Sequence, residues 1–94
     1  MRIATLLWDD WNEDHITRHG VSAEEVEEVC ANPGRMLRRA RGGTYIVFGC
    51  TTDGRELVVI LVPRGPEPSF FYPITARAMT HSERRYFRAR KGSK

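Results

Sequence analysis

The hydrophobic pattern changes its period at Gly34, and this change constrains the fold more than any other feature of the chain. Before Gly34, apolar residues recur at helical spacing. After Gly34, they form β-branched and aromatic runs separated by tight turns. A chain of 94 residues is too short to build two separately packed cores. The sequence therefore predicts a single α+β domain over residues 1–94.

The expected first element is a short strand over residues 3–8, followed by a helix that ends near residue 18. Asp9 or Asp10 is suited to cap the start of this helix, with Glu13 three residues after Asp10. Gly20 supplies a left-handed end. A first helix capped by an aspartate is therefore expected directly after the strand.

The second helix has clearer limits. Ser22 and Glu25 have the spacing of a capping box, and Val21 and Val26 occupy the positions of a hydrophobic staple. The segment 32–34, Asn-Pro-Gly, ends the helical pattern. The acidic residues of this helix are best explained by solvation and by the helix dipole.

Residues 35–76 predict four antiparallel strands, and a basic helix follows them. Gly42-Gly43 is expected to form a two-residue turn, and Asp53-Gly54 is a strong hairpin signal. Thr80 and Glu83 form a second capping box, which opens a helix through about Lys91. The expected strands are Arg35–Arg41 at an exposed edge, Thr44–Thr52, Leu57–Val62 in the centre with both faces covered, and Ser69–Ala76 with Pro73 at an edge or a bulge, with Pro63–Pro68 as a loop. The predicted architecture is an antiparallel sheet of four to five strands with two N-terminal helices and one C-terminal helix.

The net charge of +3 conceals a strong polarity along the chain. Residues 1–34 hold two arginines against eight carboxylates, a net of −6. Residues 35–94 hold thirteen arginines and lysines against four carboxylates, a net of +9. Such a basic segment suggests an anionic partner, most commonly nucleic acid. Arginine outnumbers lysine thirteen to two, which fits phosphate recognition but also fits a GC-rich coding bias.

The C-terminal segment is the best candidate for chemistry. RNA cleavage without a metal needs a base for the 2′-OH proton, cations near the phosphorus, and an acid for the leaving 5′-oxygen. Arginine and histidine supply these groups. The alternative is a solvated basic helix whose aromatic residues pack on the sheet. The segment holds Arg77, His81, Arg84, Arg85, Arg88 and Arg90, with Tyr86 and Phe87 between them.

Other possible sites give weaker signals. His15 and His19 share a helical face, but no third ligand accompanies them, so a metal site is not expected. His19 at a helix end also fits a purely dipole-stabilising role. Trp8 and Trp11 are expected to pack in the core or at an interface. The arginines at 35, 38, 39 and 41 either protect an edge strand or track a phosphate backbone.

Composition and short motifs exclude several classes of protein. The longest apolar run, residues 57–62, is far too short to cross a membrane, and no export signal precedes Asp9. Cys30 and Cys50 form no CxxC pair, and reduced thiols in a cytoplasm are the simpler expectation. No zincin, P-loop, dinucleotide-binding or EF-hand motif is present.

Two motif clusters resemble the family of BrnT-type toxins. At the N-terminus these are Trp8-Asp9, Asn12, the run Arg18-His19-Gly20-Val21 and Glu24-Glu25-Val26; toward the C-terminus they are Ile74-Thr75-Ala76-Arg77, Thr80, Glu83-Arg84 and Tyr86. Order and spacing agree from about Leu7 to Arg88. The resemblance implies a fold related to RelE-type toxins and a cytoplasmic ribonuclease toxin of a type II toxin–antitoxin system. It also implies no cofactor, a cognate antitoxin with a ribbon-helix-helix DNA-binding domain, and promoter binding only through the toxin–antitoxin complex.

The resemblance and the chemistry together give a set of expected site residues. Arg77 and Arg84 are expected to stabilise the transition state, with His19 or His81 moving protons. Glu83 either orients an arginine or only closes the capping box. The expected catalytic residues are His19, Arg77, His81, Glu83 and Arg84, and the expected RNA-binding residues are Arg38, Arg39, Arg41, Arg64, Tyr86 and Arg88. The expected substrate is mRNA, which the toxin cuts either free or on the ribosome.

Three functions are consistent with these features. The first is a metal-independent ribonuclease toxin that inhibits translation and growth and is neutralised by its antitoxin. The second is a basic binding module that holds RNA without cutting it, which predicts salt-sensitive binding and intact RNA. The third is an inactive toxin homologue that only binds its antitoxin, which predicts a tight complex and no effect on growth.

Overall fold

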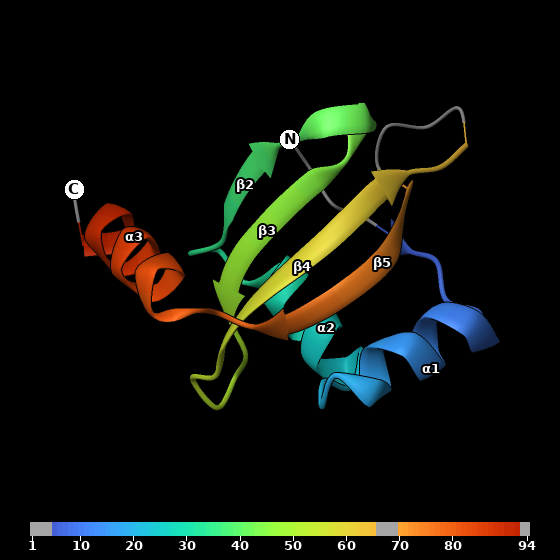
Figure 1. The fold of residues 1–94 in the computed structure, drawn as a ribbon, viewed down its shortest axis with the longest axis horizontal. Helices are drawn as coiled ribbons and strands as arrows, with labels where there is room; N and C mark the ends of the chain where they lie inside the picture. The colour runs from blue at the N-terminus through green and yellow to red at the C-terminus, as the bar shows by residue number, and fades with distance from the viewer. Residues whose placement is uncertain (1–4, 66–69, 93–94) are drawn as a thin grey trace.

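The structure analysed is a computed structural model, which describes residues 5–65 and 70–92 (Figure 1). Parts of the expected first strand, of the loop over residues 63–68 and of the C-terminal tail lie outside the described residues. The expected order of strand, two helices, four strands and helix is confirmed. The elements are β1 (Thr5–Leu6), α1 (Asp10–Arg18), α2 (Ala23–Ala31), β2 (Met36–Arg39), the 3₁₀ turn η1 (Arg41–Gly43), β3 (Tyr45–Cys50), β4 (Glu56–Pro63), β5 (Phe70–Ala78) and α3 (His81–Gly92).

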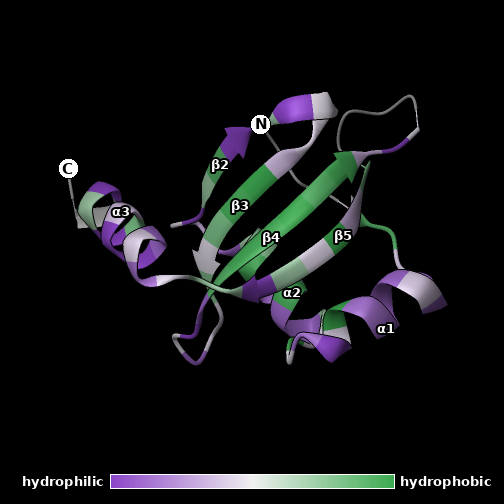
Figure 2. Cartoon of the chain, viewed as in Figure 1, coloured by the Kyte–Doolittle hydropathy of each residue, from purple (hydrophilic) through white to green (hydrophobic). Residues whose placement is uncertain are grey.

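The five strands form one sheet in the order β1-β5-β4-β3-β2. The pairs β2–β3, β3–β4 and β4–β5 are antiparallel, as predicted. Strand β1 pairs in parallel with β5, so the sheet is mixed rather than wholly antiparallel. The aliphatic strand β4 is central, and Figure 2 shows its hydrophobic character along almost its whole length. β2 forms one edge of the sheet, as its poor alternation predicted.

The first two helices begin and end at local signals in the sequence. Asp9 caps α1, but its capping-box partner is Asn12 and not Glu13, because Asp9 rather than Asp10 is the cap. The Ser22–Glu25 box of α2 is confirmed, and Val21 and Val26 are both buried beside it. Gly20 has a φ of 77°, which suits the turn between the helices.

The turn between β2 and β3 has three residues and not the two that were predicted. The Ala40 N–H donates to the Thr44 carbonyl, so Arg41 joins Gly42 and Gly43 in the loop. Both glycines have positive φ, at 68° and 75°. The expected hairpin at Asp53-Gly54 is confirmed, with the Gly54 N–H donating to the Thr51 carbonyl.

Pro73 lies at a bulge in β5, which is one of the two predicted positions, an edge or a bulge. Ile60 pairs with Thr75 and Leu61 pairs with Pro73, so one extra residue enters β5 between them. The Pro73 carbonyl accepts a 3.0 Å hydrogen bond from the side-chain amide of Asn12. The first helix and the bulged strand are therefore tied together by a buried side chain.

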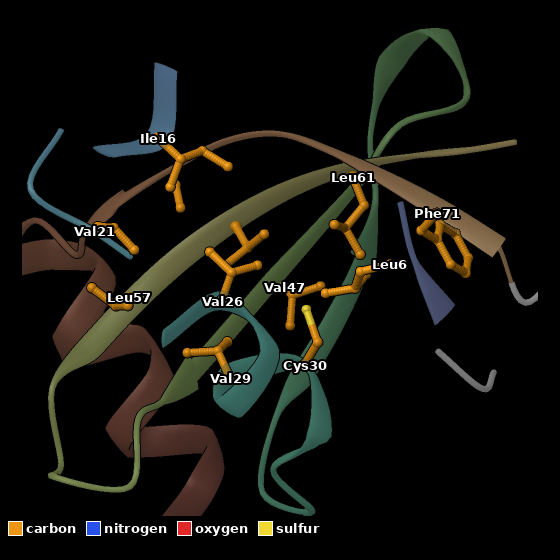
Figure 3. Close-up of a cluster of buried hydrophobic side chains, with 12 residues drawn as sticks. Leu6, Ile16, Val21, Val26, Val29, Cys30, Val47, Leu57, Leu61 and Phe71 are labelled. Carbon is orange, nitrogen blue, oxygen red and sulfur yellow. The ribbon is translucent and has the colours of Figure 1, made fainter. Parts of the chain in front are cut away.

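The sheet separates two hydrophobic clusters. The larger cluster lies between the sheet and helices α1 and α2, and it includes Leu57, Val59 and Leu61 from β4 (Figure 3). The smaller cluster contains Val58 from the opposite face of β4 and Phe87 from α3. Side chains alternate along a strand, so α3 covers the face opposite α1 and α2. The prediction that the central strand is covered on both faces is confirmed only in part, because Ile60 and Val62 on the α3 side of β4 are half-buried.

Candidate functional site

A pocket of about 320 Å³ lies between α3 and the sheet. Its floor is apolar, and polar and charged groups surround it. The floor consists of Ile46, Phe48, Val58 and Ile60, and the border consists of Arg38, Arg77, Ser82, Glu83 and Tyr86. Hydrophobic contact area beneath a few converging polar groups is typical of a ligand-binding site.

The strand register explains why two distant arginines border the same pocket. Arg38 pairs with Ile46, which pairs with Ile60. In the neighbouring row, Phe48 pairs with Val58, which pairs with Arg77. Both rows face α3, so Arg38 on β2 and Arg77 on β5 lie on opposite sides of the apolar floor. Three strand spacings separate β2 and β5, which is about 14 Å.

Arg77 is held rigidly by a carboxylate. Its Nη1 and Nη2 donate to the two oxygens of Glu83 at 2.7 and 2.9 Å, which is a bidentate ion pair. Glu83 Oε1 also accepts the Thr80 N–H, and Glu83 N–H donates to the Thr80 hydroxyl. The bonds from Arg77 and from the Thr80 N–H lower the pKa of Glu83 to about 2, and the same pair raises the pKa of Arg77.

Tyr86 is surrounded by two guanidinium groups and a phenyl ring. The Cζ atoms of Arg38 and Arg90 lie 5.5 and 5.7 Å from the centre of the Tyr86 ring. Phe48 meets the same ring edge-on at 5.8 Å. These distances are within the range of cation–π contact. Tyr86 therefore joins α3 to β2 across the pocket.

The two imidazoles expected to act near Arg77 lie in different places. His19 caps the C-terminus of α1, which packs on the opposite face of the sheet, and the structure does not bring it to the pocket. His81 is the first residue of α3, directly before the pocket residues Ser82 and Glu83. Of the two histidines, His81 is therefore the one on a pocket-lining element.

The remaining predicted residues are spread around the pocket and beyond it. Arg84 donates to the Met79 carbonyl at 2.8 Å, just before α3. Arg88 makes a bidentate ion pair with Glu56, with distances of 2.7 and 2.9 Å, which raises the pKa of Arg88. Arg39 lies over Tyr45, whose ring packs on Phe71 of the larger cluster, so Arg39 faces away from the pocket.

Two more predicted RNA-binding residues lie outside the pocket lining. Arg41 is in η1, the turn beyond β2. Arg64 stacks on Tyr72 at 4.4 Å, and the Tyr72 hydroxyl donates to Asp9.

The pocket also contains residues that the sequence did not single out, namely Ser82 and the apolar floor. The alternation of β3 and β4 could have indicated that floor, once the face covered by α3 was known.

An exposed aromatic column runs along α1 on the other side of the molecule. The Trp11 and His15 rings are stacked at 5.0 Å, and His19 meets His15 edge-on. Trp11 is 59% exposed, so it does not lie in the core, and the other predicted position, at an interface, stays a prediction for this residue. Trp8 is partly buried against the larger cluster, and its Nε1 donates to Glu27.

Three further observations concern metal binding, cysteine chemistry and the membrane. Among residues 5–65 and 70–92, no group of three or more His, Cys, Asp or Glu side chains is arranged to hold a metal ion. Burial raises the pKa of Cys30 to about 12, so this thiol is a poor nucleophile. In the same part of the chain, no helix has the length and apolar character needed to span a bilayer.

Comparisons with known proteins add an independent line of evidence. A sequence model of the family described as the ribonuclease toxin BrnT of type II toxin–antitoxin systems matches residues 8–83. The fold is similar to that of the Brucella abortus ribonuclease toxin BrnT, a 1.1 Å crystal structure, with a TM-score of 0.64 and 18% identity. That match covers 82% of this chain and 97% of the Brucella chain. No curated protein sequence matches the chain. The family match includes most of the chain, with the N-terminal motif cluster and the C-terminal cluster as far as Glu83, and the chain therefore belongs to the BrnT family of ribonuclease toxins, which act on RNA and pair with an antitoxin in type II systems.

Proposed function

We propose that this toxin cleaves RNA in the pocket between α3 and the sheet, by metal-independent transfer of the phosphodiester to the neighbouring 2′-oxygen. The observation that carries the proposal is the bidentate Arg77–Glu83 pair at the border of an apolar pocket. A fixed arginine beside a surface that can hold a base is suited to bind a phosphodiester in one orientation.

In the proposed reaction, the 2′-oxygen forms a bond to phosphorus while the bond from phosphorus to the 5′-oxygen breaks. The 2′-OH proton passes to a base, and the leaving 5′-oxygen receives a proton. The products are a 2′,3′-cyclic phosphate and a 5′-hydroxyl. Negative charge accumulates on the phosphoryl oxygens in the transition state, and Arg77 stabilises this charge with a preorganised donor.

Glu83 is a positioning residue in this proposal and not the base. A base works best with a pKa near the working pH, whereas the bonds from Arg77 and Thr80 hold the pKa of Glu83 at about 2. His81 is the proposed proton-transfer residue, because it opens the helix that lines the pocket. His19 has no proposed catalytic part, since α1 packs on the other face of the sheet. Arg84 is proposed to fix the start of α3 through its bond to the Met79 carbonyl.

The proposed partners follow from membership of the family. We propose a ribbon-helix-helix antitoxin that covers the cationic pocket face and carries the complex to its own promoter. The proposed place of action is the cytoplasm, on mRNA that is free or on the ribosome. An antitoxin that blocks the pocket should present carboxylates to Arg38 and Arg77, because these are the cationic groups at its border.

The function is tested by controlled induction in a bacterial host, with and without the adjacent open reading frame. Growth arrest that a neighbouring ribbon-helix-helix protein relieves would support the toxin, its activity and its partner together. The Arg77→Ala variant should not arrest growth. A wild-type chain that binds RNA without cutting it would favour a binding module. A chain that binds its antitoxin tightly and never affects growth would favour an inactive homologue.

A further inference from the structure

On the basis of the proposed function, we infer that Arg38, Tyr86 and Arg90 form a second phosphate-binding subsite, in which the Tyr86 ring positions both arginines and does not itself stack on a base. This subsite lies across the apolar floor from Arg77. Its ligand is a phosphodiester group of the RNA substrate, adjacent to the one that is cleaved.

The first observation is the convergence of residues from two elements on one ring. Arg38 comes from the edge strand β2, and Arg90 comes from the last turns of α3. Their guanidinium carbons both lie within 6 Å of the Tyr86 ring centre, at 5.5 and 5.7 Å. The ring quadrupole attracts both cations and restricts where they can move. Tyr86 therefore brings together two like charges that would otherwise repel each other.

The second observation concerns the charge balance of the pocket face. The Arg77 charge is compensated by Glu83, and the Arg88 charge is compensated by Glu56. Within the described ranges, neither Arg38 nor Arg90 forms an ion pair with a carboxylate. Two uncompensated guanidinium groups around one ring attract an anion more strongly than the neutral Arg77–Glu83 pair does. Among the four arginines Arg38, Arg77, Arg88 and Arg90, the long-range attraction for RNA should therefore come mainly from Arg38 and Arg90.

The third observation is the apolar floor between the two charged sites. Ile46, Phe48, Val58 and Ile60 lie between Arg38 and Arg77. A nucleobase can rest on these side chains while its flanking phosphates reach the arginines on either side. Tyr86 is already in contact with two cations and with Phe48, so the floor is the better surface for a base.

Binding to a non-cleavable RNA tests the subsite separately from catalysis. The probe is a fluorescent 2′-O-methyl oligonucleotide of about eight nucleotides, which lacks the attacking hydroxyl. Arg38→Gln and Arg90→Gln should each weaken binding roughly tenfold. Each should also reduce the slope of log Kd against log salt concentration by about 0.7, the value for one phosphate contact on a single strand. Tyr86→Phe keeps the ring and should bind like the wild type.

Tyr86→Leu separates the positioning role from base stacking. If Tyr86 acts through the arginines, the substitution should weaken binding and lower the salt slope in the wild type. In the Arg38→Gln/Arg90→Gln double variant, Tyr86→Leu should change Kd by less than about twofold, because the effect of Tyr86 depends on the two arginines that are now absent. If Tyr86→Leu weakens RNA binding in the double variant as much as it does in the wild type, with the salt slope unchanged, Tyr86 is a stacking platform and the inference is overturned.

Arg39→Gln is the matched control, because Arg39 is next to Arg38 and also lies over a tyrosine, but on the opposite face of the sheet. Arg39→Gln should change Kd less than Arg38→Gln or Arg90→Gln does. Thermal unfolding of each variant confirms that it is folded. Wild-type affinity for Arg38→Gln and Arg90→Gln, together with lost cleavage in Arg77→Ala, would refute the subsite and leave the proposed function intact. Failure of the wild type to cut a 2′-hydroxyl RNA would instead refute the proposed function.

Discussion

The Glu83 carboxylate both caps a helix and forms an ion pair. Its Oε1 accepts the Thr80 N–H at the start of α3, and both of its oxygens accept from Arg77. The sequence left open whether this residue caps the helix or orients an arginine, and the structure shows both contacts together. The helix cap fixes the carboxylate, and the carboxylate fixes the guanidinium group. Local helix formation is thereby coupled to the geometry of the proposed catalytic site.

Glu83→Gln separates these two contacts. Glutamine still completes a capping box, but it carries no charge to hold Arg77. We expect kcat for cleavage of a short RNA to fall by roughly 10- to 100-fold, with a smaller change in KM and a lower Tm at neutral pH, because the charged pair also stabilises the fold. Thr80→Ala is the control, because it removes the side-chain cap and leaves the ion pair. It should cost about 1 kcal/mol of stability with cleavage retained. An unchanged kcat in Glu83→Gln would contradict the positioning role.

Asn12 has a structural role that its polar character does not suggest. It is 0% exposed, and its amide donates to the carbonyl of Leu7, directly after β1, and to the carbonyl of Pro73 in the neighbouring strand β5. We expect Asn12→Ala to lower the free energy of unfolding by about 2–4 kcal/mol, since it leaves buried carbonyls without donors. Chemical denaturation measures this loss. Thr17→Ala, an exposed change on the same helix, should stay within about 1 kcal/mol, and an equally small effect for Asn12→Ala would refute the role.

At the scale of elements, α3 is attached to the sheet by a few specific contacts. Phe87 is buried in the smaller cluster, and Arg88 pairs with Glu56 at the start of β4. The Met79 N–H, just before the helix, donates to the Glu56 carbonyl. Glu56 therefore contacts both Met79, just before α3, and the Arg88 side chain on α3 itself. These contacts set how closely Tyr86 approaches Arg38.

Arg88→Gln should loosen α3 without unfolding the protein. Exposed ion pairs contribute at most about 1 kcal/mol, so the global stability should change little. Amide hydrogen exchange in α3 should become faster, and binding of the non-cleavable RNA should weaken because the pocket border is less ordered. Arg85→Gln, an exposed substitution on the same helix, is the matched control. Unchanged exchange in Arg88→Gln would show that the Arg88–Glu56 pair does not hold the helix.

The start of α3 should also be sensitive to acid. The pKa of Glu83 is lowered in the folded state from its usual 4.5 to about 2. A lowered folded-state pKa stabilises the fold above the unfolded value, and this contribution is lost as the pH falls from about 4.5 to about 2. The Tm of the wild type should therefore decline over this interval more steeply than the Tm of Glu83→Gln. Parallel declines in the two proteins would contradict the ion pair.

Elements with local signals were predictable, and relations between elements were not. The boxes at Ser22–Glu25 and Thr80–Glu83 and the Asp53-Gly54 turn each depend on residues a few positions apart. The parallel pairing of β1 with β5 joins residues about 65 positions apart, and no short motif encodes it. Whether Arg38 or Arg39 faces the pocket depends on the register of β2, which the weak alternation of residues 35–41 left undetermined.

At the scale of the whole molecule, the fold places the acidic helices of residues 1–34 and the basic C-terminal helix on opposite faces of the sheet. The acidic helices α1 and α2 pack against one face, and the basic helix α3 packs against one end of the other (Figure 1). Arg38, Arg77 and Arg90 converge on the α3 face although they come from three different elements. Arg39 and His19 belong to the opposite face. The charge distribution in the sequence indicated an anionic partner, but only the fold separates the residues that meet at the pocket from those that do not.

The most direct test is cleavage of a defined RNA by the purified protein in the presence of EDTA. The wild type should produce fragments with 2′,3′-cyclic phosphate and 5′-hydroxyl ends. Arg77→Ala should cut about 10²- to 10³-fold more slowly while binding the non-cleavable RNA with nearly unchanged affinity. Arg18→Ala, which removes an arginine from an exposed ion pair on α1, should cut like the wild type. Equal cleavage by Arg77→Ala and the wild type would contradict the proposed site.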